Sequence, residues 1–317
     1  IFDEIHKKKK WKLWLKGIFD SAKEKQMFLV TGSAKINTFK KTGDSLAGRY
    51  LSYRLYPLDL KEIVTLAQSP SFKKEYPQVF KDDKEKNEFF LNRLLSCSGF
   101  PEPFLVNEEG FYQRWQQSHL DVILKQDILD SELVRNIKQI ETLTYLLTER
   151  TGSPLSYNSL REDLRTDDKS VKRWVDILEN SYVVFRIYPY VSKSLSNAIK
   201  KAPKLYFYDY CRVEDSALRL ENLVAFSLLK EIHYRRDIKG EIFDLRYLRN
   251  KQHREIDFLV TKNNKPHLLI EVKESEDSPS ENFRIFESYV PGVKKIQLVK
   301  NLKEEKLTKS GVLITSM

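Results

Sequence analysis

The chain has 317 residues, 41% of them hydrophobic, which is enough for two or three hydrophobic cores. Its net charge of +10 favours a polyanionic partner such as nucleic acid, although a lysine-rich proteome would give the same excess without any binding. Two cysteines exclude a disulfide framework and fit a reducing cytosol, and no apolar run approaches the ~20 residues of a membrane helix; we therefore expect a cytoplasmic protein without a membrane partner.

Residues 1–60 predict the second half of a parallel α/β sheet, with an amphipathic helix at 11–20 between two buried strands. The first strand ends in Asp3 and Glu4. Two such carboxylates can hold Mg²⁺ through water and polarise an attacking water molecule. The second strand, over residues 28–30, is followed by the small polar residues Thr31 and Ser33.

The segment Ser-Leu-Ala-Gly-Arg-Tyr at 45–50 places Arg49 after a glycine-containing approach. An arginine at such a place predicts a γ-phosphate contact or an arginine finger. The alternative is a structural salt bridge to Asp44 or Glu62.

Residues 63–130 predict a helical region that is broken by prolines. Helices are expected at 61–67, 85–97 and 112–128, with breaks at Pro70, Pro77 and 101–103.

Residues 131–200 predict a winged helix, with helices at 131–149, 157–164 and 169–178 and a wing strand at 182–188. The third helix of a helix-turn-helix enters the major groove, so Lys169, Lys172 and Arg173 are candidates for phosphate contacts. Val171, Trp174 and Leu178 are expected to face the core. The alternative is that this unit only packs between domains.

The C-terminal residues predict a mixed sheet with strands at 205–209, 242–247, 256–261, 267–273 and 295–299. One of these strands carries Asp257 and the next carries Glu271 and Lys273. Because side chains alternate along a strand, the last two share one face, while Leu268, Ile270 and Val272 take the other. Charges on so apolar a strand are costly unless they have a role.

Two carboxylates can bind a divalent metal ion, and a lysine beside them can stabilise phosphate charge. A helix predicted at 217–232 carries Glu221 within its apolar stripe. That glutamate is either a further ligand or an acid that borders the stripe beside Arg219. The set of Asp257, Glu271 and Lys273 resembles the PD-(D/E)XK nuclease signature, and the alternative is an edge strand with one solvated face.

Both ends of the chain, with Ser-Gly-Phe-Pro-Glu-Pro at 98–103 and Arg-Glu-Ile-Asp-Phe at 254–258, closely resemble the AAA-type ATPases of bacteria and archaea that carry a C-terminal PD-(D/E)XK nuclease-like domain. The resemblance spans nearly the whole chain and implies an α/β fold class with four units. These are a partial P-loop AAA module at 1–62, a helical lid at 63–130, the winged helix at 131–200 and a nuclease-like α/β domain at 201–317.

The resemblance implies ATP and Mg²⁺ as cofactors, and nucleic acid and a homo-oligomer as partners. It assigns catalytic roles to Asp3, Glu4, Thr31, Ser33, Arg49, Asp257, Glu271 and Lys273. It assigns cofactor binding to Asp3, Ser33 and Arg49, and metal binding to Asp3, Glu221, Asp257 and Glu271. It also places a strand-end aspartate at Asp209.

No Gly-x-x-x-x-Gly-Lys-Ser/Thr occurs in the sequence. In the family this phosphate-binding loop lies upstream of the acidic strand, so we expect the chain to be a fragment that binds ATP poorly by itself. The function expected for the parent protein is ATP-driven action on nucleic acid through the nuclease-like domain. The alternative is a non-catalytic signalling or interaction ATPase whose nuclease-like domain only binds.

Overall fold

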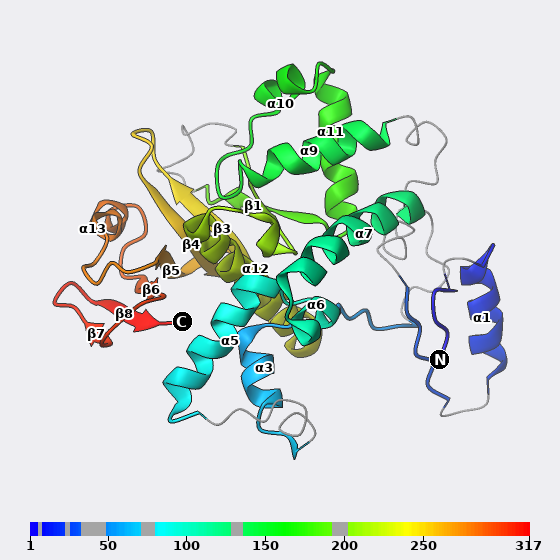
Figure 1. Ribbon diagram of the computed structural model, residues 1–317, viewed down its shortest axis with the longest axis horizontal. Coiled ribbons are helices and arrows are strands. Elements are labelled where there is room, and N and C mark those ends of the chain that lie inside the picture. Colours follow the sequence, from blue (N-terminus) through cyan, green and yellow to red (C-terminus); the bar gives the residue numbers. More distant parts are fainter. Residues whose placement is uncertain (6–7, 23–25, 33–48, 71–79, 128–135, 192–201) are drawn as a thin grey trace.

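A computed structural model describes residues 1–5, 8–22, 26–32, 49–70, 80–127, 136–191 and 202–317. Its centre is a mixed sheet with the strand order β2-β1-β3-β4-β5-β6-β8-β7 (Figure 1). The strands are β1 (Val184–Pro189), β2 (Lys204–Phe207), β3 (Phe243–Arg249), β4 (Glu255–Lys262), β5 (Lys265–Lys273), β6 (Lys294–Val299), β7 (Lys306–Leu307) and β8 (Val312–Ser316). The α/β class predicted from the sequence is confirmed.

Two helices cover opposite faces of this sheet. Helix α12 (Ser216–Lys239) packs with the Leu268, Ile270 and Val272 side of β5, as the alternation of that strand predicts. Helix α13 (Glu281–Glu287) packs with Leu269 on the other side. Strands β3, β4 and β5 form an antiparallel meander, and the connection through α13 makes β6 parallel to β5.

The five strands predicted for the C-terminal region are confirmed as β2 to β6, but the sheet extends beyond them. The expected wing strand is β1, which pairs antiparallel with β2 and parallel with β3 through Tyr188 and Arg246. A hairpin of the main sheet therefore spans residue 200, where a domain boundary was predicted. Strands β7 and β8 were not predicted.

The helices between residues 60 and 180 lie close to their predicted positions. They are α3 (Leu60–Leu66), α5 (Asp83–Cys97), α6 (Pro101–Val106), α7 (Glu109–Asp127), α9 (Ile137–Thr148), α10 (Tyr157–Asp163) and α11 (Asp168–Asn180). A short 3₁₀ turn, η3 (Tyr210–Arg212), follows β2. The break predicted at 101–103 does separate α5 from α7, but the prolines at 101 and 103 also begin the short helix α6, which was not predicted. Proline is tolerated in the first helical turn, where its missing N–H has no partner to lose.

Helices α9, α10 and α11 share a core of their own that continues into β1 and β2. Val171, Trp174 and Leu178 are buried in it, as predicted. An isolated bridge between Pro154 and Lys204 joins the loop before α10 to β2. The three-helix unit is thereby attached to the edge of the main sheet.

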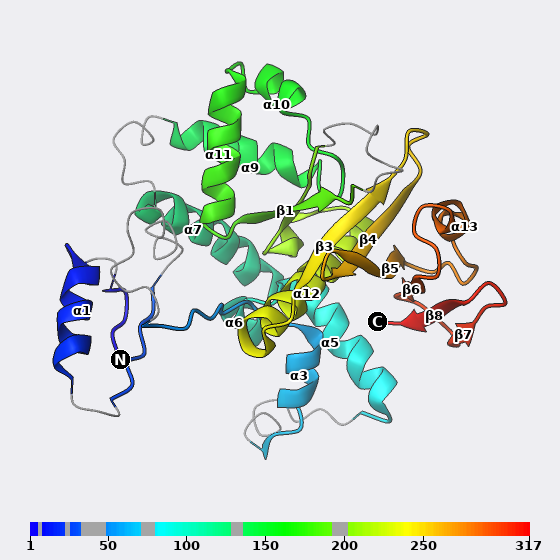
Figure 2. The same ribbon diagram turned by 180° about the vertical axis from the view of Figure 1, so that it is seen from behind.

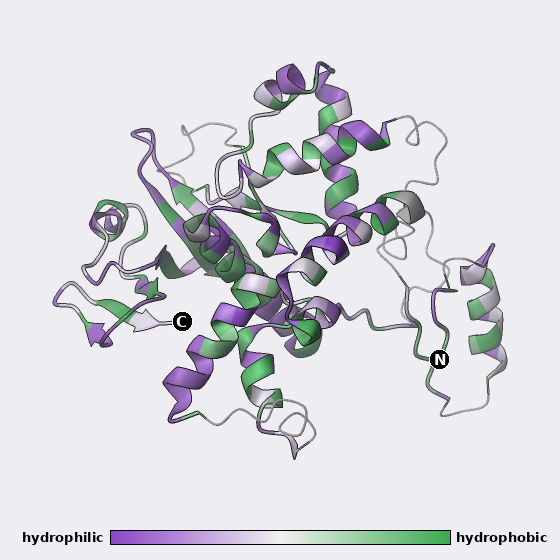
Figure 3. Cartoon of the chain, in the orientation of Figure 1, coloured by the Kyte–Doolittle hydropathy of each residue, from purple (hydrophilic) through white to green (hydrophobic). Residues whose placement is uncertain are grey.

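The N-terminal unit lies apart from this body and is reached through an extended segment (Figures 1 and 2). Helix α1 (Trp11–Ser21) is confirmed, and Figure 3 shows hydrophilic and hydrophobic residues alternating along its ribbon. The two buried strands predicted here were wrong for the described residues. A single parallel bridge joins Phe2 to Val30, and Ile1 and Leu29 are 88% and 58% exposed, because among the described residues neither segment has a second neighbouring strand.

The segment that follows this unit lies along α12. Arg54 pairs with Asp237 at 3.0 Å, and the Tyr56 hydroxyl is 2.5 Å from His233 Nδ1. Lys230 donates to the Pro57 carbonyl at 2.7 Å and also pairs with Glu62. These contacts attach the start of α3 to the same helix that carries Glu221.

This docking leaves no room at Gly99, whose carbonyl accepts from the Leu58 amide at 2.7 Å. A Cβ built on Gly99 would lie under 3.0 Å from the Leu58 carbonyl oxygen.

We expect Gly99→Ala to destabilise the protein by about 1–3 kcal/mol, measured by thermal unfolding. In the matched Gly110→Ala, the nearest atom is the end of the Arg114 side chain at 3.6 Å, and alanine is the better helix former, so no loss is expected. Equal melting temperatures for the two variants would contradict this account.

Candidate functional site

Strands β4 and β5 bring together the acids that the sequence singled out. Phe258 pairs with Ile270, and Asp257 and Glu271 each lie one residue beyond that pair in the antiparallel ladder. The two residues therefore face each other on adjacent strands, which brings side chains on one face within about 5 Å. The Val272 amide also donates to Asp257 Oδ2 at 2.9 Å.

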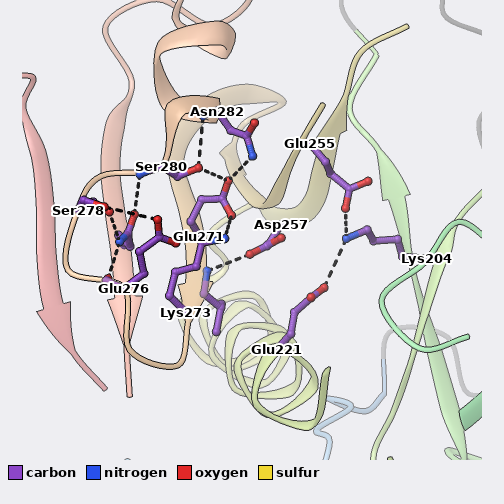
Figure 4. Close-up of polar contacts among 12 residues, drawn as sticks. Lys204, Glu221, Glu255, Asp257, Glu271, Lys273, Glu276, Ser278, Ser280 and Asn282 are labelled. Atoms are coloured by element: carbon purple, nitrogen blue, oxygen red, sulfur yellow. Dashed lines mark hydrogen bonds and ion pairs between the residues drawn. The ribbon is translucent and has the colours of Figure 1, made fainter. Parts of the chain in front are cut away.

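Glu271 is 1% exposed and is held from the side of α13 (Figure 4). Its Oε1 accepts from Ser280 Oγ at 3.2 Å and from Asn282 Nδ2 at 3.1 Å. Lys273 lies 3.9 Å from Oε2, and its side chain is 31% exposed, so its ammonium group can also meet a ligand from solvent.

The loop that presents Ser280 to Glu271 is fixed by Gln297 on β6. This fully buried amide donates to the carbonyl oxygens of Glu276 and Ser278 at 2.9 and 2.8 Å and accepts from the Ser280 amide at 2.9 Å. A second layer of hydrogen bonds thus orients the groups around the buried carboxylate.

A buried lysine lies on the other side of Asp257. Lys204, 1% exposed at the start of β2, pairs with Glu221 at 3.4 Å and with Glu255, as Figure 4 shows. Glu221 also accepts from the Tyr206 hydroxyl at 2.7 Å, and Glu255 pairs with Arg249 at 3.0 Å. Burial by itself lowers the pKa of Lys204, but the surrounding carboxylates outweigh it and raise that pKa, so the ammonium form is retained.

Asp257 and Glu221 differ from ordinary surface carboxylates in their pKa. Burial, with the negative charge of Glu271, raises the pKa of Asp257 to about 8. Burial also raises the pKa of Glu221 to about 7, although the attraction of Lys204 opposes this rise. Near neutral pH the site therefore holds protons that a divalent cation could displace.

The predicted metal ligands are only partly brought together. Asp257 and Glu271 meet, whereas Glu221 is engaged with Lys204 and Tyr206. Across the described ranges, no group of three or more His, Cys, Asp or Glu side chains is arranged to hold a metal ion. The ligand role of Glu221 stays a prediction. Asp209, the expected strand-end aspartate, lies away from these acids, where it accepts from the Tyr112 hydroxyl at 2.9 Å.

The N-terminal candidates are arranged in part. Thr31 donates its hydroxyl to Asp3, and the Phe2–Val30 bridge places these two chain segments side by side. Glu4 has a left-handed backbone with φ of 50°. Arg49 pairs with Asp20 at 3.5 Å, while Ser33 lies outside the described residues. Arg49 therefore forms a salt bridge, as the alternative supposed, but its partner is Asp20, which that alternative did not name.

The predicted nucleic-acid residues Lys169, Lys172 and Arg173 are exposed along α11. Two acids on the same helix are engaged elsewhere, because Arg186 of β1 binds Asp176 at 2.7 Å and also binds Glu179. This arrangement offsets acidic charge that would otherwise oppose a polyanion near α11.

Sequence reasoning missed Lys204, Gln297, Ser280 and Asn282. The strand expected at 205–209 began one residue after Lys204, whereas β2 begins at Lys204 and all four of its residues are buried. A lysine that begins an apolar strand was the available signal. The other three residues have polar side chains that are common in loops and carry no such signal.

The N-terminal residues 1–64 match the sequence model of a family described as an AAA domain. Residues 88–211 and 219–317 match two further families, each described as a domain of unknown function (DUF8612 and DUF4143). The matches at the two ends fit an AAA-type ATPase-like protein.

An uncharacterized protein of Methanocaldococcus jannaschii, MJ1544, is 25% identical over 306 residues, which cover 92% of this chain and 65% of that protein. A second protein of that organism, MJ1637, is 25% identical over 65% of this chain and 46% of its own. An uncharacterized protein of Haemophilus influenzae is 22% identical over 74% and 56%, respectively. The chain therefore spans less than two thirds of the length of these relatives.

No solved structure matches the chain. Within the described residues, no helix is long and apolar enough to cross a membrane.

The raised pKa of Asp257 gives a test of this geometry by pH. An exposed aspartate has a pKa of about 3.9, so the folded protein binds the proton more tightly than the unfolded chain does. The contribution of this proton to the free energy of unfolding is fully present below about pH 4 and is lost as the pH rises through about 8. In chelator, we expect Asp257→Asn to melt higher than wild type at pH 8, by ~2–4 °C for each kcal/mol regained, and to converge with it towards pH 5.

The control is Asp244→Asn on β3, whose carboxylate pairs with Arg236 at 2.9 Å at the partly exposed rim of the sheet. It should leave the pH slope of the melting temperature unchanged. Parallel slopes for wild type and Asp257→Asn would show that Asp257 is ionised throughout.

Proposed function

We propose that the chain is part of an AAA-type ATPase whose C-terminal unit is PD-(D/E)XK nuclease-like, binds one divalent metal ion and acts on nucleic acid. The observation that carries this proposal is the convergence of Asp257, Glu271 and Lys273 from two neighbouring strands. The order α12–β3–β4–β5–α13–β6, with acids on a helix and on two strands, supports the nuclease-like reading.

The donor set suits a hard cation. Asp257 and Glu271 offer carboxylate oxygens, which are ligands that Mg²⁺ and Mn²⁺ accept together with several waters. A metal ion bound there would supply an activated water or a polarised phosphate. The residues of the chain would orient it: Ser280 and Asn282 hold Glu271 in place, and the partly exposed Lys273 can meet the phosphate charge.

In the N-terminal unit, we propose that Asp3 binds Mg²⁺ through water and that Glu4 orients the water that attacks ATP. The hydrogen bond from Thr31 to Asp3 supports this proposal, because it holds the carboxylate at the junction of two chain segments. Ser33 and Arg49 are proposed to contact the nucleotide, with Arg49 acting between subunits of a homo-oligomer.

A second candidate function is a non-catalytic interaction ATPase. It is favoured by the absence, among the described residues, of a group of three ligating side chains. It is also favoured by the engagement of Glu221 with Lys204. In that case the C-terminal unit would bind a partner without cleaving a phosphodiester.

Metal binding separates these two functions. We expect calorimetry with Mn²⁺ at pH 8 to show one ion per chain, and Asp257→Asn to weaken its affinity by about tenfold or more. Asp244→Asn on the neighbouring strand is the control and should leave the affinity unchanged. Equal uptake by wild type and Asp257→Asn would remove the metal site and leave the interaction module.

Nucleic-acid binding is tested by its salt dependence. Each phosphate contact releases a counterion, so the log–log salt slope for duplex DNA should fall by about one for each charge removed. We expect the Lys169, Lys172 and Arg173 triple alanine variant to lose about two to three from this slope. The matched control is triple alanine at Lys8, Lys9 and Lys10, which removes the same charge from the N-terminal unit. The same slope in the α11 variant and in wild type would make the three-helix unit a packing element.

A further inference from the structure

The ammonium group of Lys204 occupies the cation position on one side of the acidic cluster. Its side chain is 1% exposed, and its Nζ lies 3.4 Å from Glu221 Oε1, in contact with Glu255 and 5.5 Å from the centre of the Tyr247 ring. Glu221 completes its contacts with the Tyr206 hydroxyl at 2.7 Å. The Glu221 carboxylate therefore makes these contacts with residues of β2.

A turn from the three-helix unit holds this arrangement in place. The Leu155 amide donates to the Pro203 carbonyl at 2.8 Å, the Gly152 amide donates to the Leu205 carbonyl at 3.2 Å, and Pro154 bridges to Lys204. Gly152 has a φ of +73°, and a Cβ on it would lie 3.0 Å from Glu221 Oε1. The turn at 151–155 thus lies directly against the lysine–glutamate pair.

Resting on the metal site proposed above, we propose that Lys204 is a built-in competitor for the divalent ion. While its ammonium group holds Glu221, the ion has only Asp257 and Glu271 as protein carboxylates. When Lys204 withdraws, Glu221 can turn towards Asp257 and become the third ligand. The physical reason is that two cations a few ångströms apart repel, and one carboxylate cannot serve both at full strength.

The same contacts indicate how the competition would be controlled. Lys204 belongs to β2, and β2 is tied to the 151–155 turn by backbone hydrogen bonds. A shift of α9, α10 and α11 that carries this turn away would pull on the strand that holds the ammonium group. The three-helix unit would then regulate the metal affinity of a site to which it contributes no ligand.

The test is the Mn²⁺ affinity of four proteins, measured by calorimetry: wild type, Lys204→Gln, Lys204→Arg, and Lys204→Gln combined with Glu221→Gln. We expect Lys204→Gln to bind Mn²⁺ about tenfold or more tighter than wild type, because Glu221 joins the ligands. Lys204→Arg keeps the charge and should show no such gain. The double variant should lose the gain, because the added ligand is gone.

Unchanged or weaker binding by Lys204→Gln would overturn the proposal, and so would a gain that persists in the double variant. Binding by Lys204→Gln without binding by wild type would support the competition, even though it contradicts a metal site in the resting protein. An Mn²⁺ affinity that falls in Asp257→Asn but is unchanged in Lys204→Gln would support the metal site and overturn the competition. If no variant binds Mn²⁺, both proposals fail.

Removal of Lys204 leaves buried carboxylates without their counter-charge and could unfold the chain. Circular dichroism is then the readout, because an ion that binds only the folded state must restore folding. We expect millimolar Mn²⁺ to refold Lys204→Gln and Mg²⁺ to do so more weakly. A variant that stays unfolded in both ions would overturn the proposal.

Discussion

The buried ammonium group of Lys204 is the interaction on which the candidate site depends. An ammonium ion is costly to remove from water, and it is tolerated only where carboxylates replace the water. Here the carboxylates come from α12 and β4, so a single charge joins three elements that are distant in the sequence. The loss of either partner would leave a buried charge that is only partly compensated.

A neutral contact next to this ion pair fixes the same elements. Asn222 of α12 is fully buried, accepts from the Phe207 amide at 2.9 Å and donates to the Phe207 carbonyl at 2.8 Å. Strand β2 is at the end of the sheet order, so the asparagine side chain takes the place of a neighbouring strand there. Asn222 therefore sets the position of Glu221 relative to β2, and this places the Glu221 carboxylate next to Lys204.

The sequence predicted much of this fold because its signals are local. The alternation in β5 identified which residues pack on α12, and the apolar spacing of α11 identified Trp174 and Leu178 as buried. The rest depended on contacts between distant segments. Nothing local to residues 184–189 shows that they join the main sheet, and nothing local to Lys204 shows that its partners come from residues 221 and 255. The buried strands expected before residue 32 were wrong because a strand pattern says nothing about whether a neighbour is present.

Helix α12 contacts two distant parts of the described chain. Its C-terminal half holds residues 54–62, at the end of the stretch that matches the AAA family, and its first turns carry Glu221. The same 24-residue helix therefore contacts residues 54–62 through its C-terminal half and the lysine–glutamate pair through its first turns. Two elements thus bear on the same carboxylate, the helix that carries it and the turn at Gly152. The turn of the three-helix unit, Lys204 of β2 and, through that lysine, Glu255 of β4 therefore meet around Glu221.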